Sequence, residues 1–229
     1  MHAVSLLPSH KKYTVGKILC LGQNYASHAK EMGGSPSTTP IIFLKPSTAI
    51  IGDGDLIILP KISNEVHHEV ELTVLIGKSG KNIPQSGAYE YVEGYGIGLD
   101  MTMRDKQKEA KRAGNPWSIA KGFDTSAALS AFVPKSLVKD PHALDIMLKV
   151  NGQIRQQSNT SNMIFRIDVI ISFLSSIFTL EEGDVIYTGT PEGVGSVVSG
   201  DTIDAEIPGV GTLHHKVVSD QHSFPRTAN

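Results

Sequence analysis

The sequence predicts a single α+β domain that is rich in β-strands. Three observations lead to this prediction. Short apolar runs with a period of two recur along the chain, between turns rich in Gly, Pro, Asn and Asp, as β-strands require. Helical periodicity is clear in only a few segments, the strongest at residues 163–178. Strands and helices do not alternate regularly, which disfavours a doubly wound parallel sheet.

The composition is that of an ordinary globular protein. The chain has 229 residues, 40% of them hydrophobic and 19% charged. The formal net charge is −2 and no segment is strongly basic, so we expect no nucleic-acid partner. Arg166 and Asp168 interrupt the longest apolar stretch, so we expect no membrane span, and residues 1–17 lack the apolar core of a secretory signal. Cys20 is the only cysteine and is expected to be an inert buried thiol. The absence of a possible internal disulfide suggests a reducing compartment, either the cytoplasm or the mitochondrial matrix.

In the first half of the chain, residues 1–16 are expected to be a short leader before one catalytic domain at residues 17–218. A strand at 18–21 is followed by a short helix that runs to Met32, where two glycines stop it. Residues 33–40 are small and polar, so they form either a lid beside this helix or a plain surface connection. Further strands are expected at residues 41–44, 56–59 and 67–77.

The stretch at 67–77 has the clearest strand pattern. One face carries Val70, Leu72, Val74 and Ile76, and the other carries Glu69, Glu71, Thr73 and Leu75. This alternation predicts a strand with one buried apolar face. Glu is a poor strand residue, so two of them on one face need a reason. Two carboxylates about 7 Å apart at Cα can converge on one hard cation, or they can form the solvated face of the strand.

The second half of the chain continues the strand-rich pattern. Thr102 is expected to cap a helix at 103–113 that ends at Gly114, and Thr160 or Ser161 to cap the helix at 163–178. Asn151-Gly152 is a hairpin turn signal. The strands expected here are residues 91–99, 144–150, 154–157, 184–188, 202–207 and 212–218. Residues 219–229 are expected to be a C-terminal tail.

Five residues form two groups that could carry chemistry. Asp100 ends a Gly-rich strand, and it is the best third ligand for a cation at Glu69 and Glu71, although such an Asp is also a common turn or cap residue. Together they predict an open carboxylate site for Mg²⁺, for which Mn²⁺ or Ca²⁺ could substitute. His28 and Glu31 lie three residues apart on one helix, either as an acid–base dyad or as a surface pair.

Lys121 and Thr190 are weaker candidates. Lys121 lies in a mostly uncharged stretch, so its ammonium could point into a cavity and hold an oxyanion, or it could be a surface lysine. Thr190 lies in a Gly-rich run at 187–195 that lacks the Gly-Lys-Ser/Thr of a phosphate loop, so we reject phosphate binding. The backbone amides of this run and the Thr190 hydroxyl could still bind a carboxylate.

These candidates lie in a series of ordered motifs. The motifs are GQNY at 22–25 with His28 and Glu31, FLKP at 43–46, HHEVEL at 67–72, LDMT at 99–102 with Arg104 and Gln107, PW at 116–117 with Lys121, LKVNG at 148–152, MIF at 163–165, GDVI at 183–186, TGTP at 188–191 and GVG at 193–195. This series resembles the fumarylacetoacetate hydrolase family. The chain looks nearest to its small single-domain branch, which includes acylpyruvate hydrolases that can also decarboxylate oxaloacetate.

The resemblance implies a role for each candidate. Glu69, Glu71 and Asp100 would hold Mg²⁺ or Mn²⁺, and His28 and Glu31 would be a water-activating dyad on a closing lid. Lys121 would orient the water or stabilise charge. The substrate pocket would be lined by Lys45, Arg104, Gln107 and Thr190. The resemblance also implies a mixed β-roll wrapped around a helix, and a homodimer. The catalytic motifs begin by residue 22, so the separate N-terminal domain of longer family members is not expected, nor is fumarylacetoacetate as the first-choice substrate.

The expected activity is metal-dependent hydrolysis of the C–C bond of acylpyruvates, which are 2,4-dioxo acids, to pyruvate and a carboxylic acid. A water activated by Glu31 and His28 would attack C4, and the metal and Lys121 would stabilise the pyruvate enolate that leaves. The alternatives on the same site are an oxaloacetate decarboxylase or tautomerase and a 2-hydroxyhepta-2,4-diene-1,7-dioate isomerase. A non-catalytic binding protein with the same fold is a further alternative, and the intact set of candidate residues speaks against it.

Overall fold

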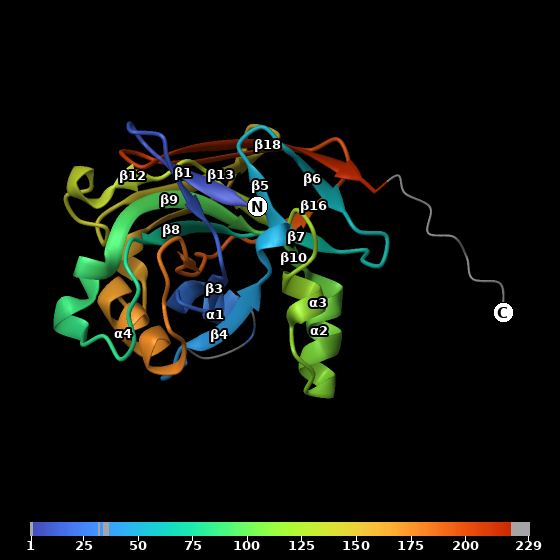
Figure 1. The fold of residues 1–229 in the computed structure, drawn as a ribbon. Coiled ribbons are helices and arrows are strands. Elements are labelled where there is room, and N and C mark those ends of the chain that lie inside the picture. Colours follow the sequence, from blue (N-terminus) through green and yellow to red (C-terminus); the bar gives the residue numbers. More distant parts are fainter. Residues whose placement is uncertain (1, 32, 34–36, 221–229) are drawn as a thin grey trace.

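A computed structural model describes residues 2–31, 33 and 37–220 of the chain and shows a strand-rich fold with a long curled sheet and few helices (Figure 1). The largest sheet has the strand order β4-β3-β15-β8-β9-β11-β5, with β12 also paired to β9. Its strands are β3 (Ile18–Gly22), β4 (Ile41–Lys45), β5 (Ile50–Gly52), β8 (Val70–Ile76), β9 (Val92–Asp100), β11 (Ala127–Leu129), β12 (Val133–Pro134) and β15 (Val185–Tyr187). The α+β prediction is therefore confirmed.

Three smaller sheets complete the described strands. One has the order β14-β13-β17-β18-β6, with β6 (Leu56–Leu59), β13 (Asp145–Val150), β14 (Gln153–Asn159), β17 (Thr202–Ile207) and β18 (Gly211–Ser219). Another has the order β10-β7-β16, with β7 (Val66–His68), β10 (Thr102–Met103) and β16 (Gly195–Val197). The third is the hairpin of β1 (Ala3–Leu6) and β2 (Lys11–Thr14). The pairs β3–β15, β5–β11 and β6–β18 are parallel, so the expectation of mixed sheets is confirmed.

The helices are short. The α-helices are α1 (Ala26–Glu31), α2 (Arg104–Ala113), α3 (Ser118–Lys121) and α4 (Ile167–Ile177), and the 3₁₀ helices are η1 (Ser47–Ala49), η2 (Gln85–Tyr91), η3 (Lys135–Leu137) and η4 (Thr160–Asn162). In Figure 1, α2 and α3 project together away from the sheets, while α4 lies under the large sheet. None of the helices among the described residues is long and apolar enough to cross a membrane.

The large sheet is covered on both faces, and this positions the site. One face joins the second sheet and the buried stripe of α4 in the main core, which includes Leu72 and Leu148. The other face forms a second core that includes Leu75 and Tyr187 and is covered by the β1–β2 hairpin. The predicted division of faces along 70–76 is correct, but both faces are buried. The leader expected at residues 1–16 therefore contributes an ordered, partly buried hairpin.

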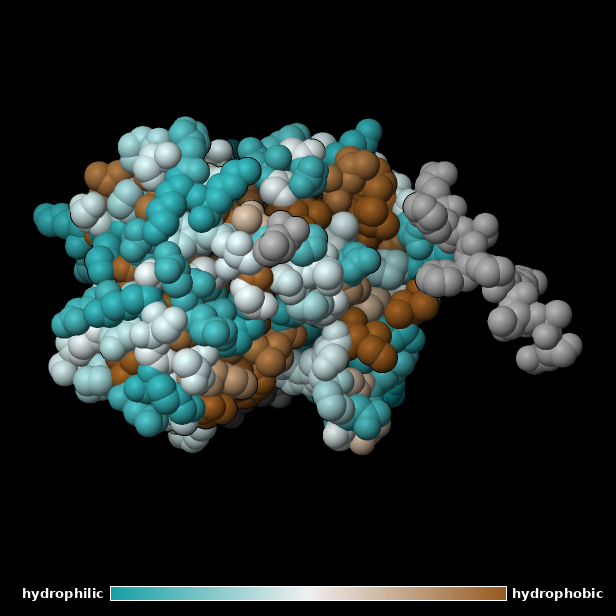
Figure 2. Space-filling view, viewed as in Figure 1, coloured by the Kyte–Doolittle hydropathy of each residue, from teal (hydrophilic) through white to brown (hydrophobic). Residues whose placement is uncertain are grey.

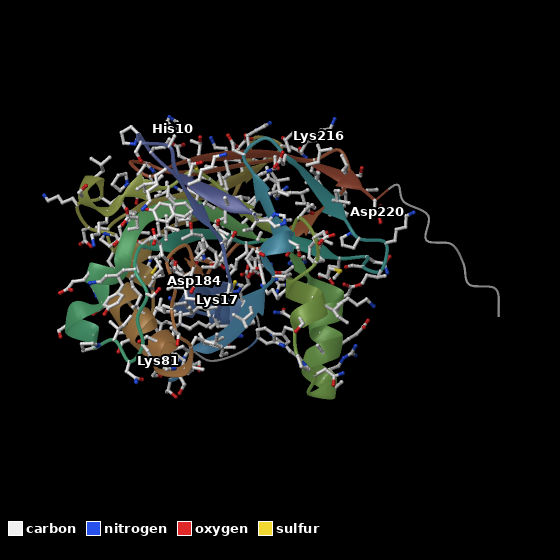
Figure 3. The ribbon with its side chains drawn as sticks, in the orientation of Figure 1. His10, Lys17, Lys81, Asp184, Lys216 and Asp220 are labelled. Carbon is white, nitrogen blue, oxygen red and sulfur yellow. The ribbon has the colours of Figure 1, made fainter. Side chains whose placement is uncertain are left out.

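Two features anchor the large sheet. Gly98 of β9 lies against the ring of Tyr187, where a Cβ atom would come within 2.4 Å of the ring, so a glycine is needed for this close approach. At the other end, the buried Asp184 carboxylate lies 2.7 Å from the Lys17 ammonium and accepts a hydrogen bond from the backbone of Glu181 (Figure 3). This pair fixes the start of the parallel strands β3 and β15.

Several local expectations need correction. The single strand expected at 67–77 is divided between two sheets, with Glu69 at the break between β7 and β8. Thr102 does not cap α2, because the helix begins at Arg104 and the Asp105 carboxylate accepts hydrogen bonds from Ser63 and Asn64 instead. The helix expected from 163 begins at Ile167, because residues 160–162 form the separate turn η4.

Other local expectations are confirmed. Gly114 ends α2 with a positive φ of 69°, and Asn151 and Gly152, with φ values of 51° and 75°, form the two-residue turn between β13 and β14. Cys20 is fully buried, and burial raises its pKa well above its ordinary value. Within residues 33–40, expected to be either a lid or a plain surface connection, residues 34–36 lie outside the described residues, as does Met32.

Candidate metal centre and active site

Three buried carboxylates meet at one end of the large sheet. Glu69 lies at the break before β8, Glu71 is in β8, and Asp100 is the last residue of the neighbouring strand β9. The β8–β9 register brings them together, because Glu71 lies opposite Gly98 and the Asp100 amide donates to the Glu69 carbonyl. One oxygen from each carboxylate lies within 4.8 Å of the others. The sequence prediction that these three residues converge is supported by this geometry.

Three cations lie against these carboxylates. The Lys121 ammonium donates to Glu69 at 2.8 Å and to Asp100 at 2.6 Å, and Lys45 lies 2.8 Å from the other oxygen of Asp100. Arg104 forms a close ion pair with Glu69. Lys121 and Asp100 are no more than 3% exposed, so these charges are held in a region with little water. Burial tends to raise the pKa of Glu69, but Lys121 and Arg104 outweigh it and hold that pKa well below its usual range.

Glu71 is the carboxylate of the three for which the described residues provide no ammonium or guanidinium partner. It accepts a hydrogen bond from the Gly189 amide at 2.6 Å. Gly189 has a φ of +97° and lies so close to Asn24 that a Cβ atom would come within 2.6 Å of it. Burial and then the charges of Asp100 and Glu69 raise the pKa of Glu71 well above its usual value. A cation bound at the three carboxylates would remove this penalty, so the donor set fits a hard divalent ion.

His28 and Glu31 form a hydrogen-bonded pair over the same cleft. Both residues come from α1, and His28 Nδ1 lies 3.0 Å from the Glu31 carboxylate. Glu31 also accepts a hydrogen bond from the Gly193 amide at 3.0 Å. His28 is buried and lines the cleft, whereas Glu31 is partly exposed. The pair can therefore accept or return a proton at the cleft, as the dyad hypothesis requires.

The cleft itself lies between the strand ends and α2. Its polar lining residues are Gln23, His28, Glu69, Arg104, Gln107, Lys111, Lys121 and Thr190, and its apolar ones include Leu21, Phe43 and Trp117. Arg104 donates to Gln107 at 2.7 Å, so the two side chains form one polar wall. Lys111 lies farther along the same helix, with its ammonium 5.0 Å from the centre of the Trp117 ring.

A buried amide joins the second sheet to this site. Gln156 of β14 accepts from the Val70 amide and pairs with His68 Nδ1, both at 3.1 Å. It also donates to Thr190 Oγ1 at 2.8 Å and to the Pro191 carbonyl at 2.9 Å. Since the Gln156 oxygen can only accept, His68 carries its proton on Nδ1. Gln156 therefore links the residues on either side of Glu69 to the loop that carries Gly189 and Gly193.

The structure brings most of the predicted site residues together, and it gives two of them other contacts. Lys45 lies behind Asp100 and contacts the carbonyls of Met101 and Lys121, so it supports the carboxylate and does not line the cleft. The Thr190 hydroxyl is already used, because it donates to the Val70 carbonyl at 2.8 Å. Sequence reasoning gave no role to Lys111, Trp117 or Gln156, although Trp117 is part of the PW motif. The position of Lys111 seven residues after Arg104, on one helical face, was a usable signal.

Comparison with known proteins gives a consistent picture. Residues 17–218 match the fumarylacetoacetate (FAA) hydrolase C-terminal family. The chain is 50% identical over 219 residues to the protein named oxaloacetate tautomerase FAHD1, mitochondrial, of Mus musculus, covering 95% of this chain and 99% of that protein. It is also 53% identical over 204 residues to an uncharacterised protein of Pyrococcus horikoshii, covering 89% of each chain.

Solved structures resemble the whole fold. A fumarylpyruvate hydrolase from Pseudomonas aeruginosa, solved with Mn²⁺ and pyruvate, aligns with a TM-score of 0.90 at 39% identity, covering 95% of this chain and 96% of that chain. A 2-hydroxyhepta-2,4-diene-1,7-dioate isomerase from Mycobacterium marinum aligns with a TM-score of 0.80 at 36% identity, covering 93% of this chain and 79% of that chain. Proteins of this shape are therefore named for hydrolase, isomerase and tautomerase activities.

Proposed function

The chain belongs to the fumarylacetoacetate hydrolase C-terminal family, and from that premise we propose that it is a divalent-metal enzyme that interconverts the enol and keto forms of oxaloacetate. The arrangement of charge at the cleft carries this proposal. Lys45, Lys121 and Arg104 balance the three carboxylates, so a bound divalent ion would leave two positive charges in addition to that of Lys111, which also lines the cleft. This excess of positive charge favours a dianionic 2-oxo acid over a monoanionic one. The relative named oxaloacetate tautomerase supports the choice of substrate.

The residues around the cleft can supply the proton transfers. A divalent ion, for which we propose Mg²⁺ with Mn²⁺ or Ca²⁺ as substitutes, would act as a Lewis acid toward the carboxylate and 2-oxo oxygens of the substrate. The Glu31 carboxylate, hydrogen-bonded to His28, would return a proton to C3 or remove it. The Lys121 ammonium would stabilise negative charge on the 2-oxo oxygen while the enol proton passes to solvent water.

Hydrolysis of acylpyruvates is the second candidate, and the His28–Glu31 pair favours it specifically. Their hydrogen bond of 3.0 Å at the wall of the cleft is the arrangement needed to deprotonate a water molecule. The attack of the water on C4 would break the bond between C3 and C4 and release a carboxylic acid and a pyruvate enolate. The Pseudomonas neighbour named fumarylpyruvate hydrolase supports this candidate. Decarboxylation of oxaloacetate would form that enolate too, without a water nucleophile.

One set of rates separates these functions. Purified protein is assayed with Mg²⁺, with Mn²⁺ and with EDTA for enol-oxaloacetate ketonisation, oxaloacetate decarboxylation and acetylpyruvate cleavage. We expect chelator-sensitive ketonisation to dominate, and Glu31→Gln to lower it at least about tenfold while metal binding by calorimetry is unchanged. Asp100→Asn should abolish metal binding. Dominant acetylpyruvate cleavage would transfer the assignment to the hydrolase, and no metal-dependent turnover of any substrate would leave a non-catalytic binding protein.

We further propose a homodimer. Apolar side chains are exposed at β4 and at the end of α4, with Leu44 43% and Ile177 52% exposed, and Figure 2 shows apolar surface over the β4 region. An apolar groove between these elements is lined by Phe43, Trp117 and Phe178 among others. Light scattering with size-exclusion chromatography should give twice the chain mass of 24.6 kDa. A monomer at micromolar concentration would contradict this proposal.

The compartment is also a proposal. A single cysteine that is buried and reduced suits the cytoplasm or the mitochondrial matrix. Cell fractionation with an antibody to the native chain would test it, and recovery from a secreted fraction would contradict it.

A further inference from the structure

We propose that Lys111 binds the distal carboxylate of the substrate and thereby selects 2-oxo diacids over 2-oxo acids with a neutral end. This inference rests on the proposed function, because it names the substrate class of the same cleft. It concerns a residue outside the carboxylate site and the dyad, and it assigns that residue to specificity.

The geometry of α2 points to this role. Arg104, Gln107 and Lys111 are spaced by three and four residues, so they share one face of the helix, and all three line the cleft. The first two form the wall beside Glu69. Lys111 is about 10 Å farther along the helix axis than Arg104, at the mouth of the cleft beside Trp117. One end of the cleft thus holds the metal ligands and the other end holds an ammonium.

The electrostatic surroundings of Lys111 favour an anion. No carboxylate of the described residues lies within ion-pair distance of its ammonium, whereas its neighbours Lys106 and Lys108 pair with Glu109 and Glu65. Burial lowers the pKa of Lys111, and the positive charges of Arg104 and Lys121 lower it further. A bound anion would offset the repulsion between the Lys111 ammonium and these cations and would stabilise its charged form.

The wall between the two ends is apolar. The rings of Phe43 and Trp117 lie 5.8 Å apart at an angle of 53°, and both line the cleft. A short carbon chain can lie along these rings while its 2-oxo acid end is at the metal ligands. A second carboxylate at the far end would then reach Lys111, whereas a methyl group there would gain no such charge-assisted contact.

Trp117 provides a binding assay that does not need turnover, because it is the only tryptophan of the chain and lies beneath Lys111. The probes are 2-oxoglutarate and 2-oxopentanoate, which have the same carbon skeleton length and differ in the distal carboxylate. Each is titrated with Mg²⁺ present, following Trp117 fluorescence with calorimetry as a second readout. We expect wild type to bind 2-oxoglutarate about tenfold more tightly than 2-oxopentanoate.

Three variants decide the inference. Lys111→Met should weaken 2-oxoglutarate about tenfold and leave 2-oxopentanoate within about twofold, while Lys111→Arg should keep the preference. Lys108→Met, an exposed lysine of the same helix that pairs with Glu65, is the matched control and should change neither affinity. Equal weakening of both probes in Lys111→Met, an unchanged preference, or no binding of either probe to wild type would overturn the inference. A preference that depends on Lys111 in a protein that turns over none of the assayed acids would support the inference and overturn the proposed function.

Discussion

Replacement of Gln156 by leucine tests the structural support of the metal centre. Leucine is close to glutamine in volume, so the variant removes hydrogen bonds and leaves little empty space. The Val70 amide, the Pro191 carbonyl and the His68 Nδ1 proton each lose the partner that Gln156 provides. A buried polar group left unpaired costs about 1–3 kcal/mol, so the three groups together should cost at least about 3 kcal/mol of unfolding free energy.

Equilibrium urea unfolding, followed by circular dichroism and Trp117 fluorescence, measures this loss. At a urea dependence of about 3 kcal/mol per molar, the midpoint should fall by about 1 M at an unchanged slope. Because Gln156 bonds the two residues that flank Glu69, it fixes the position of that carboxylate. Calorimetry should therefore also show weaker Mg²⁺ binding by the folded variant. Gln157→Leu, on the exposed face of the same strand, is the control and should change stability by less than about 0.5 kcal/mol. A Gln156→Leu variant as stable as this control would refute the reasoning.

Three further predictions follow from burial and packing. Gly98→Ala should destabilise the fold by about 1–3 kcal/mol or more, because its Cβ would come within 2.4 Å of the buried Tyr187 ring, whereas Gly87→Ala, whose Cβ would meet only Pro84 at an ordinary contact distance of 3.8 Å, should be nearly neutral in the same urea assay. Cys20 should not react with a disulfide reagent at pH 8 in the native protein and should react fully in urea, since burial raises its pKa; rapid native labelling would contradict this. Burial tends to raise the pKa of Asp105, but hydrogen bonds from a serine hydroxyl and two backbone amides outweigh it and lower that pKa, so its contribution to stability is present near neutral pH and is lost as the pH falls through the lowered value. The stability advantage of wild type over Asp105→Asn should therefore shrink from pH 6 to pH 3, and a constant difference would contradict the assignment.

The sequence indicated which carboxylates form the cluster, because the two glutamates are adjacent in the strand pattern and Asp100 ends the strand run that follows. A period of two places Glu69 and Glu71 on one face, and the hydrophobic run that ends at Asp100 predicts the neighbouring strand. The turn at Asn151-Gly152 and the end of α2 at Gly114 were predictable for the same reason, since each depends on a few adjacent residues.

Features that depend on distant contacts could not be predicted in this way. The break at Glu69 arises because Val66–His68 pairs with β10 and β16, whereas the residues after it pair with β9 and β15. Thr102 looked like a helix cap, but its hydroxyl is taken by the Asp100 carbonyl and the Lys121 ammonium. Gln156 gave no signal at all, because its only distinction is the set of partners that two other segments, residues 68–70 and 190–191, bring to it.

The projecting helix α2 has an evolutionary consequence. Its only buried residues are Arg104 and Gln107, and it contacts the body mainly through α3, β7 and β10 (Figure 1). Of the carboxylates, in contrast, Glu71 and Asp100 are part of the central strands β8 and β9, and Glu69 directly precedes β8. Mutations along the outer turns of α2 could therefore change what enters the cleft at little cost in stability. Related proteins could therefore diverge in substrate while they keep the same three carboxylates, which accords with the different activities for which the related structures are named.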